Sequence, residues 1–107
     1  MKVVVHHDER GAGFAAVGYA RAVGRAAVVV TTSGTAVANL LPAVVESAQA
    51  GLPLVLLTAD RAPESRLNGA NQAITQVSIG ALSLHCLHDY QRLLITPSDS
   101  STVQHLL

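Results

Sequence analysis

Three short polar clusters interrupt a chain that otherwise consists mainly of small and aliphatic residues. The first, Asp8-Glu9-Arg10, offers the carboxyl group of Glu9. The second, Ser33-Gly34-Thr35, is a turn of small residues ahead of an apolar, helix-like stretch. The third ends in Arg61, whose planar guanidinium can donate two parallel hydrogen bonds to a carboxylate. A carboxyl, a small-residue turn and a guanidinium would form a ligand site if the fold brought them together.

Each cluster follows a segment with the composition of a buried strand. These segments are residues 3–6, 26–32 and 52–58, which are rich in β-branched or aliphatic residues and lack polar alternation. Segments that follow parallel strands lie at the carboxyl edge of the sheet, where open α/β sheets bind ligands. A helix beginning after Thr35 would direct free backbone N–H groups toward the same edge. The topology therefore predicts that the three clusters converge.

Helix-like stretches, with apolar residues every three or four positions, alternate with the strands. The further predicted elements are helices at residues 9–23, 35–48 and 74–84, a fourth strand at 90–95, and a last helix from residue 96. Gly24 and Gly51 act as stop signals for the first two helices. This order predicts one α/β domain over residues 1–107, with a parallel sheet and helices on both faces. Both ends of the chain are abrupt, so we expect the domain to be truncated at both ends.

The composition fits this fold class and argues against several kinds of protein. Half of the 107 residues are hydrophobic, 13% are charged and 3% are aromatic, so Val, Leu, Ile and Ala must fill the core. The formal net charge is zero and there is no basic stripe, which argues against nucleic acid as a partner. The single cysteine, Cys86, cannot form an internal disulfide. Without a signal-like or membrane-spanning apolar stretch, the sequence predicts a soluble, intracellular protein with no membrane span.

Each cluster also has an ordinary structural explanation. Glu9 could serve only the positive end of the first helix, and Ser33 or Thr35 could serve only as an N-cap. Arg61 could form a surface ion pair with a nearby acid, which would contribute little to stability. The predicted convergence of all three clusters on one edge favours the functional interpretation.

Other known motifs match only in part. Residues 11–16 fit the dinucleotide fingerprint G-x-G-x-x-A, but charged residues precede it and no acid follows the second strand to hold a ribose. Residues 31–35 resemble a nucleophile elbow without its first Gly. His85, Cys86 and His88, taken as residues near a helix end, do not have a known zinc spacing, so no metal site is predicted.

The clusters and their surroundings resemble one enzyme family. The shared strings, in order, are DERGAGFAAVGYAR, TTSGTAVANLLPAVVESAQAGLPLVLLTADRAPE and GANQAI, from about residue 7 to residue 74. They look like the 2-succinyl-5-enolpyruvyl-6-hydroxy-3-cyclohexene-1-carboxylate (SEPHCHC) synthases, also called MenD, which use thiamine diphosphate (ThDP). The string SGT before a helix would indicate only the wider ThDP superfamily, whereas the combination of strings is far more specific.

This resemblance implies a ThDP pyrimidine-binding module, with the cofactor held between this module and the diphosphate-binding module of a second subunit. The full-length protein would then be a homo-oligomer. Glu9 would hydrogen-bond a ring nitrogen of the aminopyrimidine and so promote loss of the proton from the thiazolium carbon. The enzyme would be a transferase that decarboxylates 2-oxoglutarate and adds the resulting carbanion to isochorismate, in menaquinone or phylloquinone biosynthesis. Its location would be the cytoplasm of a bacterium or a plastid of a plant or alga.

The same resemblance assigns the other site residues. Ser33, Gly34 and Thr35 would line the pyrimidine end of ThDP, and Arg61 and Gln72 fall on positions that resemble substrate contacts. Magnesium would be held by a G-D-G…N motif of the diphosphate-binding module, which the chain lacks, and an early P-G-S-R-S segment is also missing. We therefore expect the chain alone to bind ThDP weakly and to be inactive.

Two departures from the family leave the substrate open. Ala62 stands where the family usually has Pro, and Phe14 stands where it often has a polar residue or His. One alternative is another ThDP-dependent carboligase or decarboxylase, which would keep Glu9 but need neither Arg61 nor Gln72. A noncatalytic remnant, and more distantly a dinucleotide-binding domain, are further alternatives.

Overall fold

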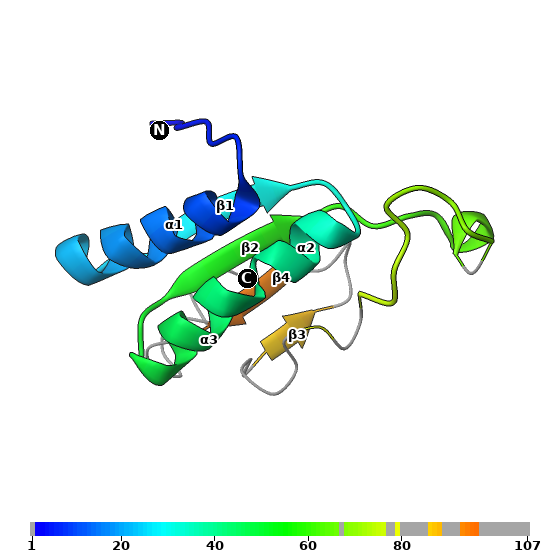
Figure 1. Ribbon diagram of the computed structural model, residues 1–107. Coiled ribbons are helices and arrows are strands. Elements are labelled where there is room, and N and C mark those ends of the chain that lie inside the picture. Colours follow the sequence, from blue (N-terminus) through cyan, green and yellow to red (C-terminus); the bar gives the residue numbers. More distant parts are fainter. Residues whose placement is uncertain (1, 67, 77–78, 80–85, 89–92, 97–107) are drawn as a thin grey trace.

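In the part of the chain that the structure describes, three α-helices pack on a mixed sheet (Figure 1). The computed structural model describes residues 2–66, 68–76, 79, 86–88 and 93–96. The elements in chain order are α1 (Glu9–Val23), β1 (Ala27–Thr31), α2 (Thr35–Asn39), α3 (Leu41–Gln49), β2 (Leu54–Thr58), the 3-10 helix η1 (Pro63–Ser65), β3 (Cys86–His88) and β4 (Leu93–Thr96). The strands lie in the order β1-β2-β4-β3. The α/β class is therefore confirmed.

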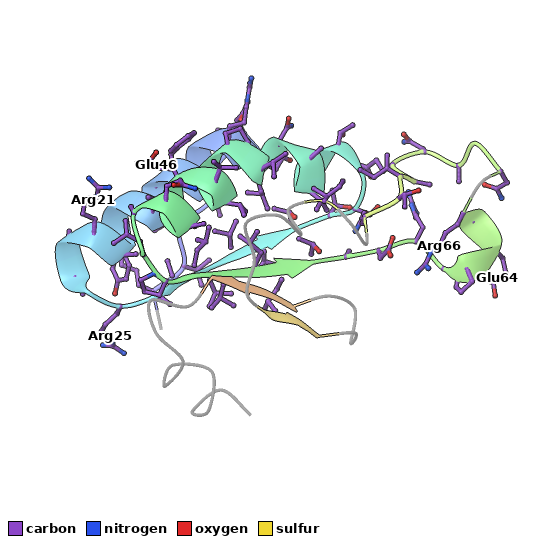
Figure 2. The ribbon with its side chains drawn as sticks, turned by 90° about the horizontal axis from the view of Figure 1, so that it is seen from below. Arg21, Arg25, Glu46, Glu64 and Arg66 are labelled. Carbon is purple, nitrogen blue, oxygen red and sulfur yellow. The ribbon has the colours of Figure 1, made fainter. Side chains whose placement is uncertain are left out.

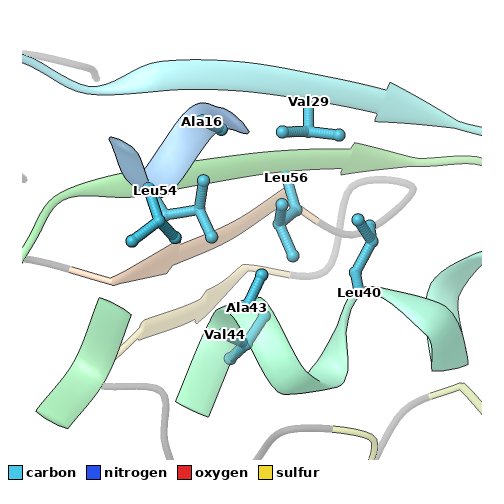
Figure 3. Packing of buried hydrophobic residues seen from close by; sticks show 8 residues of the cluster. Ala16, Val29, Leu40, Ala43, Val44, Leu54 and Leu56 are labelled. Atoms are coloured by element: carbon cyan, nitrogen blue, oxygen red, sulfur yellow. The ribbon is translucent and has the colours of Figure 1, made fainter. Parts of the chain in front are cut away.

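The core lies between the helices and one face of the sheet (Figure 3). Leu54 and Leu56 of β2 and Ala43 of α3 are at most 1% exposed. The other buried members of this cluster are Ala16, Val17, Val29, Leu40 and Val44. All are small or aliphatic, as the low aromatic content predicts.

The three helices lie on the same side of the sheet (Figure 2). On the opposite face, Val28, Val30 and Leu57 are 56%, 72% and 43% exposed. No described helix covers this second face, and the last predicted helix lies outside the described residues, so the prediction of helices on both faces stays untested. The unbroken apolar runs suggested strands covered on both sides, but side chains in β1 alternate between core and surface.

The sheet is also not wholly parallel. β1 and β2 are parallel, with Thr31 paired to Thr58 at their carboxyl ends, but β4 is antiparallel to both β2 and β3. Only residues 89–92 separate β3 from β4, which is enough for a hairpin and too few for the crossover that parallel strands need. The prediction of a fully parallel sheet is therefore wrong, as is the placement of Cys86 and His88 near a helix end.

Residues 3–6, predicted to be the first strand, have no assigned secondary structure. Val3, Val4 and Val5 are 64% to 82% exposed. A β-branched run has the propensity of a strand, but a strand forms only where a neighbour pairs with it. No described segment pairs with residues 3–6.

The helix predicted over residues 35–48 is divided into α2 and α3 at Leu40. Pro42 stands in the first turn of α3. Proline cannot donate a backbone hydrogen bond and its ring clashes with the carbonyl four residues earlier, here that of Ala38. The apolar periodicity runs through the break, so periodicity alone predicted one helix.

The helix predicted over residues 74–84 is wrong at its start, because residues 74–76 are not helical. Ile79 lies in a turn, and the other positions of that prediction lie outside the described residues. The same is true of the last helix beyond Thr96 and of positions 90–92 of the predicted fourth strand. The remainder of that strand is confirmed as β4.

Two glycines of α1 allow a matched test of how closely α1 approaches α3. A Cβ at Gly13 would lie 2.8 Å from the Ala43 Cβ, whereas a Cβ at Gly18 would meet nothing within 4 Å. Gly13→Ala is expected to lower the free energy of unfolding by about 1–3 kcal/mol, because the helices must separate. Gly18→Ala is expected to raise it by about 0.5–1 kcal/mol, because alanine favours the helix. Denaturant titration of both variants checks the opposite signs, and stabilisation by both would contradict the close approach.

Candidate functional site

Glu9 lies in the first turn of α1, directly after the N-cap residue Asp8. Its side chain is half-buried, and its Oε2 accepts a 3.4 Å hydrogen bond from Nδ2 of Asn39, the last residue of α2. A negative charge in a first turn is favoured by the helix dipole whatever else it binds. A carboxylate has about four acceptor positions, so this long bond, the one that described residues make to the Glu9 carboxylate, leaves it able to accept a ligand donor.

The neighbouring carboxyl group of Asp8 has a structural role. Its Oδ1 accepts hydrogen bonds from the backbone N–H and the Nε of Arg10, both at 2.9 Å, and its Oδ2 lies 2.6 Å from Arg10 Nη2. The side-chain bond to Arg10, and then the backbone bond, hold the pKa of Asp8 well below its usual range. The same carboxylate raises the pKa of Arg10. Asp8 therefore caps α1, and Glu9 is the acid that remains for a ligand.

Removing the Arg10 side-chain charge is expected to raise the pKa of Asp8 toward its ordinary value, about 3.9. The pKa of Asp8 in the folded chain lies below its pKa in the unfolded chain. The pair with Arg10 therefore stabilises the folded chain fully at pH values above the unfolded-state pKa, and this stabilisation is lost as the pH falls through the folded-state pKa. Carboxyl carbon NMR titration of Arg10→Gln measures the shift. Arg21→Gln, which changes an arginine bonded to Glu46 instead, should leave the Asp8 titration unchanged.

The turn after β1 is covered by the loop that returns from β2. Ser33 is 2% exposed, and its hydroxyl donates a 2.8 Å hydrogen bond to the backbone carbonyl of Gln72. Gly34 has φ 74° and ψ −126°, and a Cβ there would lie 2.6 Å from the same carbonyl oxygen. Gly34 occupies the N-cap position of α2, and no side chain caps this helix with a hydrogen bond. The alternative that Ser33 or Thr35 serves as the N-cap residue is therefore wrong. Thr35 is exposed at the first position of α2.

Arg61 lies where the chain leaves β2, within a network that shapes the loop. Its Nε donates a 3.0 Å hydrogen bond to the carbonyl of Asn71, the residue before Gln72. Asp60 accepts a 2.7 Å hydrogen bond from the Arg61 backbone N–H and forms a 3.0 Å ion pair with Arg66. The Asp60 side chain is only 10% exposed, so this pair is partly shielded from water. One of the five guanidinium donors of Arg61 is thus used to hold the loop.

The fold brings the predicted site residues into one connected region at the carboxyl ends of β1 and β2. Ser33 and Gly34 contact Gln72 directly, and Arg61 is bonded to the residue beside it. Glu9 is linked to the other end of α2, where Asn39 lies about 6 Å along the helix axis from Thr35. The predicted convergence is therefore observed for the Ser33 and Arg61 clusters, which follow the paired strands β1 and β2. Glu9 follows no strand and is joined to this region only through Asn39, and the functional roles of all these residues stay predictions.

Three further residues of this region were not predicted. Asn39 bonds Glu9, and its position as a polar residue in an apolar helical stretch could have indicated it. Gln76 is buried and bonds Gly34, but it lay in a segment assigned to a helix. The hydroxyl oxygen of Thr31 is buried and has no hydrogen-bond partner among the described residues. Buried polar atoms usually have partners, so this unpaired oxygen is an exception in the region of the site.

Residues 2–66, 68–76, 79, 86–88 and 93–96 contain no group of three His, Cys, Asp or Glu side chains that could hold a metal ion. No helix within these ranges is long and apolar enough to cross a membrane.

Comparison with known families gives the site its context. Residues 1–79 match the family described as "Thiamine pyrophosphate enzyme, N-terminal TPP binding domain". The chain belongs to this family. Thiamine pyrophosphate (TPP) is another name for ThDP. The matched region includes Glu9, the Ser33–Gly34 turn, Arg61 and Gln72.

Similar proteins confirm the resemblance to SEPHCHC synthases. The SEPHCHC synthase of Rubrobacter xylanophilus is 64% identical over 78 residues, which cover 73% of this chain and 14% of that protein. The synthase of Aliivibrio fischeri is 50% identical over all 107 residues, which cover 18% of that protein. "Protein PHYLLO, chloroplastic" of Arabidopsis thaliana is 59% identical over 71 residues, covering 66% of this chain and 4% of that protein. The chain spans less than one-fifth of the length of these curated relatives.

Proposed function

We propose that this TPP-binding domain holds the aminopyrimidine of ThDP in a SEPHCHC synthase. That enzyme would decarboxylate 2-oxoglutarate and add the resulting four-carbon unit to isochorismate. The observation that carries the proposal is the half-buried Glu9 carboxylate, joined through Asn39 and α2 to the buried Ser33–Gly34 turn. The similarity to SEPHCHC synthases over the same residues supports it.

The residues of this edge fit an aromatic ring that carries polar nitrogens. Glu9 has unused acceptor positions for a ring N–H, and Thr31 has a buried hydroxyl without a partner among the described residues. The Ser33 hydroxyl and the Gly34 N–H are already bonded within the protein, so they supply a surface shape instead of hydrogen bonds. When bound, ThDP supplies the carbanion chemistry, and the protein supplies orientation and proton handling. Glu9 would hold the proton at the ring nitrogen.

Arg61 and Gln72 would bind substrate at the loop side of the site. The Arg61 Nε is fixed on the Asn71 carbonyl, which orients the terminal nitrogens of the guanidinium as a fork. Such a fork matches a carboxylate, and both proposed substrates carry more than one carboxylate. Gln72 is half-buried and its amide would provide a neutral donor beside that fork.

The remaining parts of the active site would come from a second module. We propose that a diphosphate-binding module of another subunit holds the diphosphate and Mg2+, so that the active unit is a homo-oligomer. The site would then form at the contact between subunits. The protein would act in the cytoplasm of a bacterium or in a plastid of a plant or alga, in the synthesis of menaquinone or phylloquinone.

A chimeric enzyme tests this function. Residues 1–79 replace the matching stretch of the full-length Rubrobacter xylanophilus synthase, which is 64% identical over 78 residues. We expect the chimera to consume 2-oxoglutarate and isochorismate with release of CO2, in a reaction that requires ThDP and Mg2+. A chimera that folds and assembles as the parent enzyme does but shows no ThDP-dependent turnover would refute the proposal.

Substitution of Arg61 separates this synthase from another ThDP-dependent carboligase. In the chimera, Arg61→Ala is expected to lower kcat/KM for the carboxylate substrate by about 10- to 100-fold, the usual effect of losing a charged hydrogen bond. Arg25→Ala removes an exposed arginine at the opposite end of the sheet and should leave kcat/KM unchanged (Figure 2). If Arg61→Ala is as active as Arg25→Ala, the substrate assignment fails and only the cofactor assignment remains.

A further inference from the structure

Gln76 is a buried polar residue with no part in the proposed chemistry. Only 4% of it is exposed, and it lies in the loop that follows β2 and η1. Its Oε1 accepts a 2.6 Å hydrogen bond from the backbone N–H of Gly34. Its Nε2 donates a 3.0 Å hydrogen bond to the backbone carbonyl of Ala59. Both ends of the side-chain amide are therefore bonded to backbone.

These two partners follow the neighbouring ends of β1 and β2. The Ala59 N–H donates a 3.0 Å hydrogen bond to the Thr31 carbonyl, directly after the last paired residues of the parallel ladder. The Gln76 amide lies next to this bond, beyond the ends of the two strands. It bridges the segments that follow β1 and β2 as a backbone peptide group of a third strand would. It therefore fixes the position of the Gly34 turn relative to the end of β2.

The position of this turn also determines the backbone of Gln72. Gln72 has φ 55°, a left-handed conformation that is uncommon for a residue other than glycine. Its carbonyl is held by the Ser33 hydroxyl at 2.8 Å, and its backbone packs where a Gly34 side chain would be. Such a conformation persists only where surrounding contacts hold it. Gln76 holds the turn that makes those contacts.

We propose that Gln76 is a positioning residue, which fixes the Ser33–Gly34 turn and, through it, the left-handed Gln72. In this proposal Gln76 touches neither the cofactor nor the substrate. Through Gly34 it sets the surface offered to the cofactor ring, and through Gln72 it sets a substrate contact. The catalytic part of this inference rests on the proposed function, whereas the effect on the turn can be measured without any ligand.

Amide hydrogen exchange in the 107-residue chain tests the effect on the turn. Gln76→Met removes both hydrogen bonds at similar volume and is expected to speed exchange at the Gly34 amide by about tenfold or more, relative to the core amides of Val29 and Leu56. At a pH where the introduced carboxyl group is ionised, Gln76→Glu keeps the acceptor for Gly34 and loses the donor to Ala59. It should therefore retain Gly34 protection while shifting the carbonyl carbon resonance of Ala59. If Gln76→Met prevents folding, the Gly34 exchange rate and the Ala59 carbonyl resonance of Gln76→Glu decide whether the inference holds.

Equal Gly34 exchange in the unchanged chain and in Gln76→Met would overturn the inference, as would an unshifted Ala59 resonance in Gln76→Glu. These outcomes concern the turn alone. They are therefore distinct from failure of the proposed function, which would appear as an inactive parent chimera.

Kinetics of the chimera test the catalytic consequence. Gln76→Met is expected to lower kcat/KM for 2-oxoglutarate by roughly 10- to 100-fold, as a small misplacement of binding groups does. Gln76→Glu should recover part of this loss. Val44→Ala opens the core away from the site and gives the control for lowered stability, with kcat/KM unchanged at a temperature where the protein is folded. If kcat/KM falls in Gln76→Met and Val44→Ala only in proportion to the fraction of protein that is folded, Gln76 has a structural role alone and the proposal is wrong.

Discussion

Replacing Glu9 by Gln in the chimeric enzyme is expected to lower kcat by about 10²- to 10⁴-fold, the usual range for loss of a proton-transfer group. Glutamine has almost the same size, and its carbonyl oxygen can still accept the hydrogen bond from Asn39. It cannot, however, take a negative charge or share a proton with a ring nitrogen. The binding of 2-oxoglutarate should be little affected, so steady-state kinetics should show the loss in kcat with KM nearly unchanged.

Glu46→Gln is the matched control for this experiment. Glu46 lies on α3, 3.6 Å from Arg21, and both side chains are more than half exposed (Figure 2). The substitution removes the same charge from a surface pair that contributes little to stability, and activity should stay within about twofold. Full activity of Glu9→Gln would remove the catalytic assignment. Equal losses at both positions would show an effect of net charge or folding instead.

Gly34→Ala is expected to be the most destabilising single change in the region of the site. A side chain at φ 74° is strained, at about 1–3 kcal/mol, and the close contact with the Gln72 backbone adds about 1–3 kcal/mol of overpacking. The neighbouring atoms are backbone, so they cannot move aside as the end of a side chain can. A loss of about 3 kcal/mol corresponds to a fall in Tm of at least about 12 °C for a domain of this size. Thermal unfolding followed by circular dichroism measures it.

Gly24→Ala separates the two causes of this loss. Gly24 ends α1 with φ 69°, but a Cβ there would meet nothing within 4 Å. Its substitution should therefore produce only the backbone strain, about 1–2 kcal/mol. If Gly34→Ala lowers the free energy of unfolding no more than Gly24→Ala does, the loop does not pack on the turn as described.

Features encoded within a single stretch of the chain could be predicted from sequence. The periodicity and the following Gly24 gave the bounds of α1, and the apolar runs located β1 and β2 to within two residues. The convergence of Ser33 and Arg61 on one edge followed from the parallel pairing of those two strands. The bounds of these elements are local features, and the convergence needed in addition only the order of the elements along the chain.

Features that depend on distant parts of the chain could not be predicted in this way. Residues 3–6 have strand propensity, but pairing needs a neighbour that propensity does not reveal. The antiparallel direction of β4 depends on the short connection that joins it to β3. Residues 86–88, which form β3, were not predicted to be a strand. Gln76 resembled a helical position, whereas its bonds are to residues 17 and 42 positions away. Pro42 is a local signal, and the break in the helix could have been predicted from it.

The small size of α2 has a consequence for how the site would open. A helix of five residues has almost no intrinsic stability in water, so α2 persists through the burial of Ala36 and Val37 and through an anchor at each of its two ends. One anchor is the Gly34–Gln76 bond, and the other joins Asn39 to Glu9. Unwinding of this one turn would release the acid and the ring-facing surface in the same event, while the core around α3 and β2 stays folded. Ligand entry could thus be governed by a local helix–coil equilibrium, with no movement of whole domains.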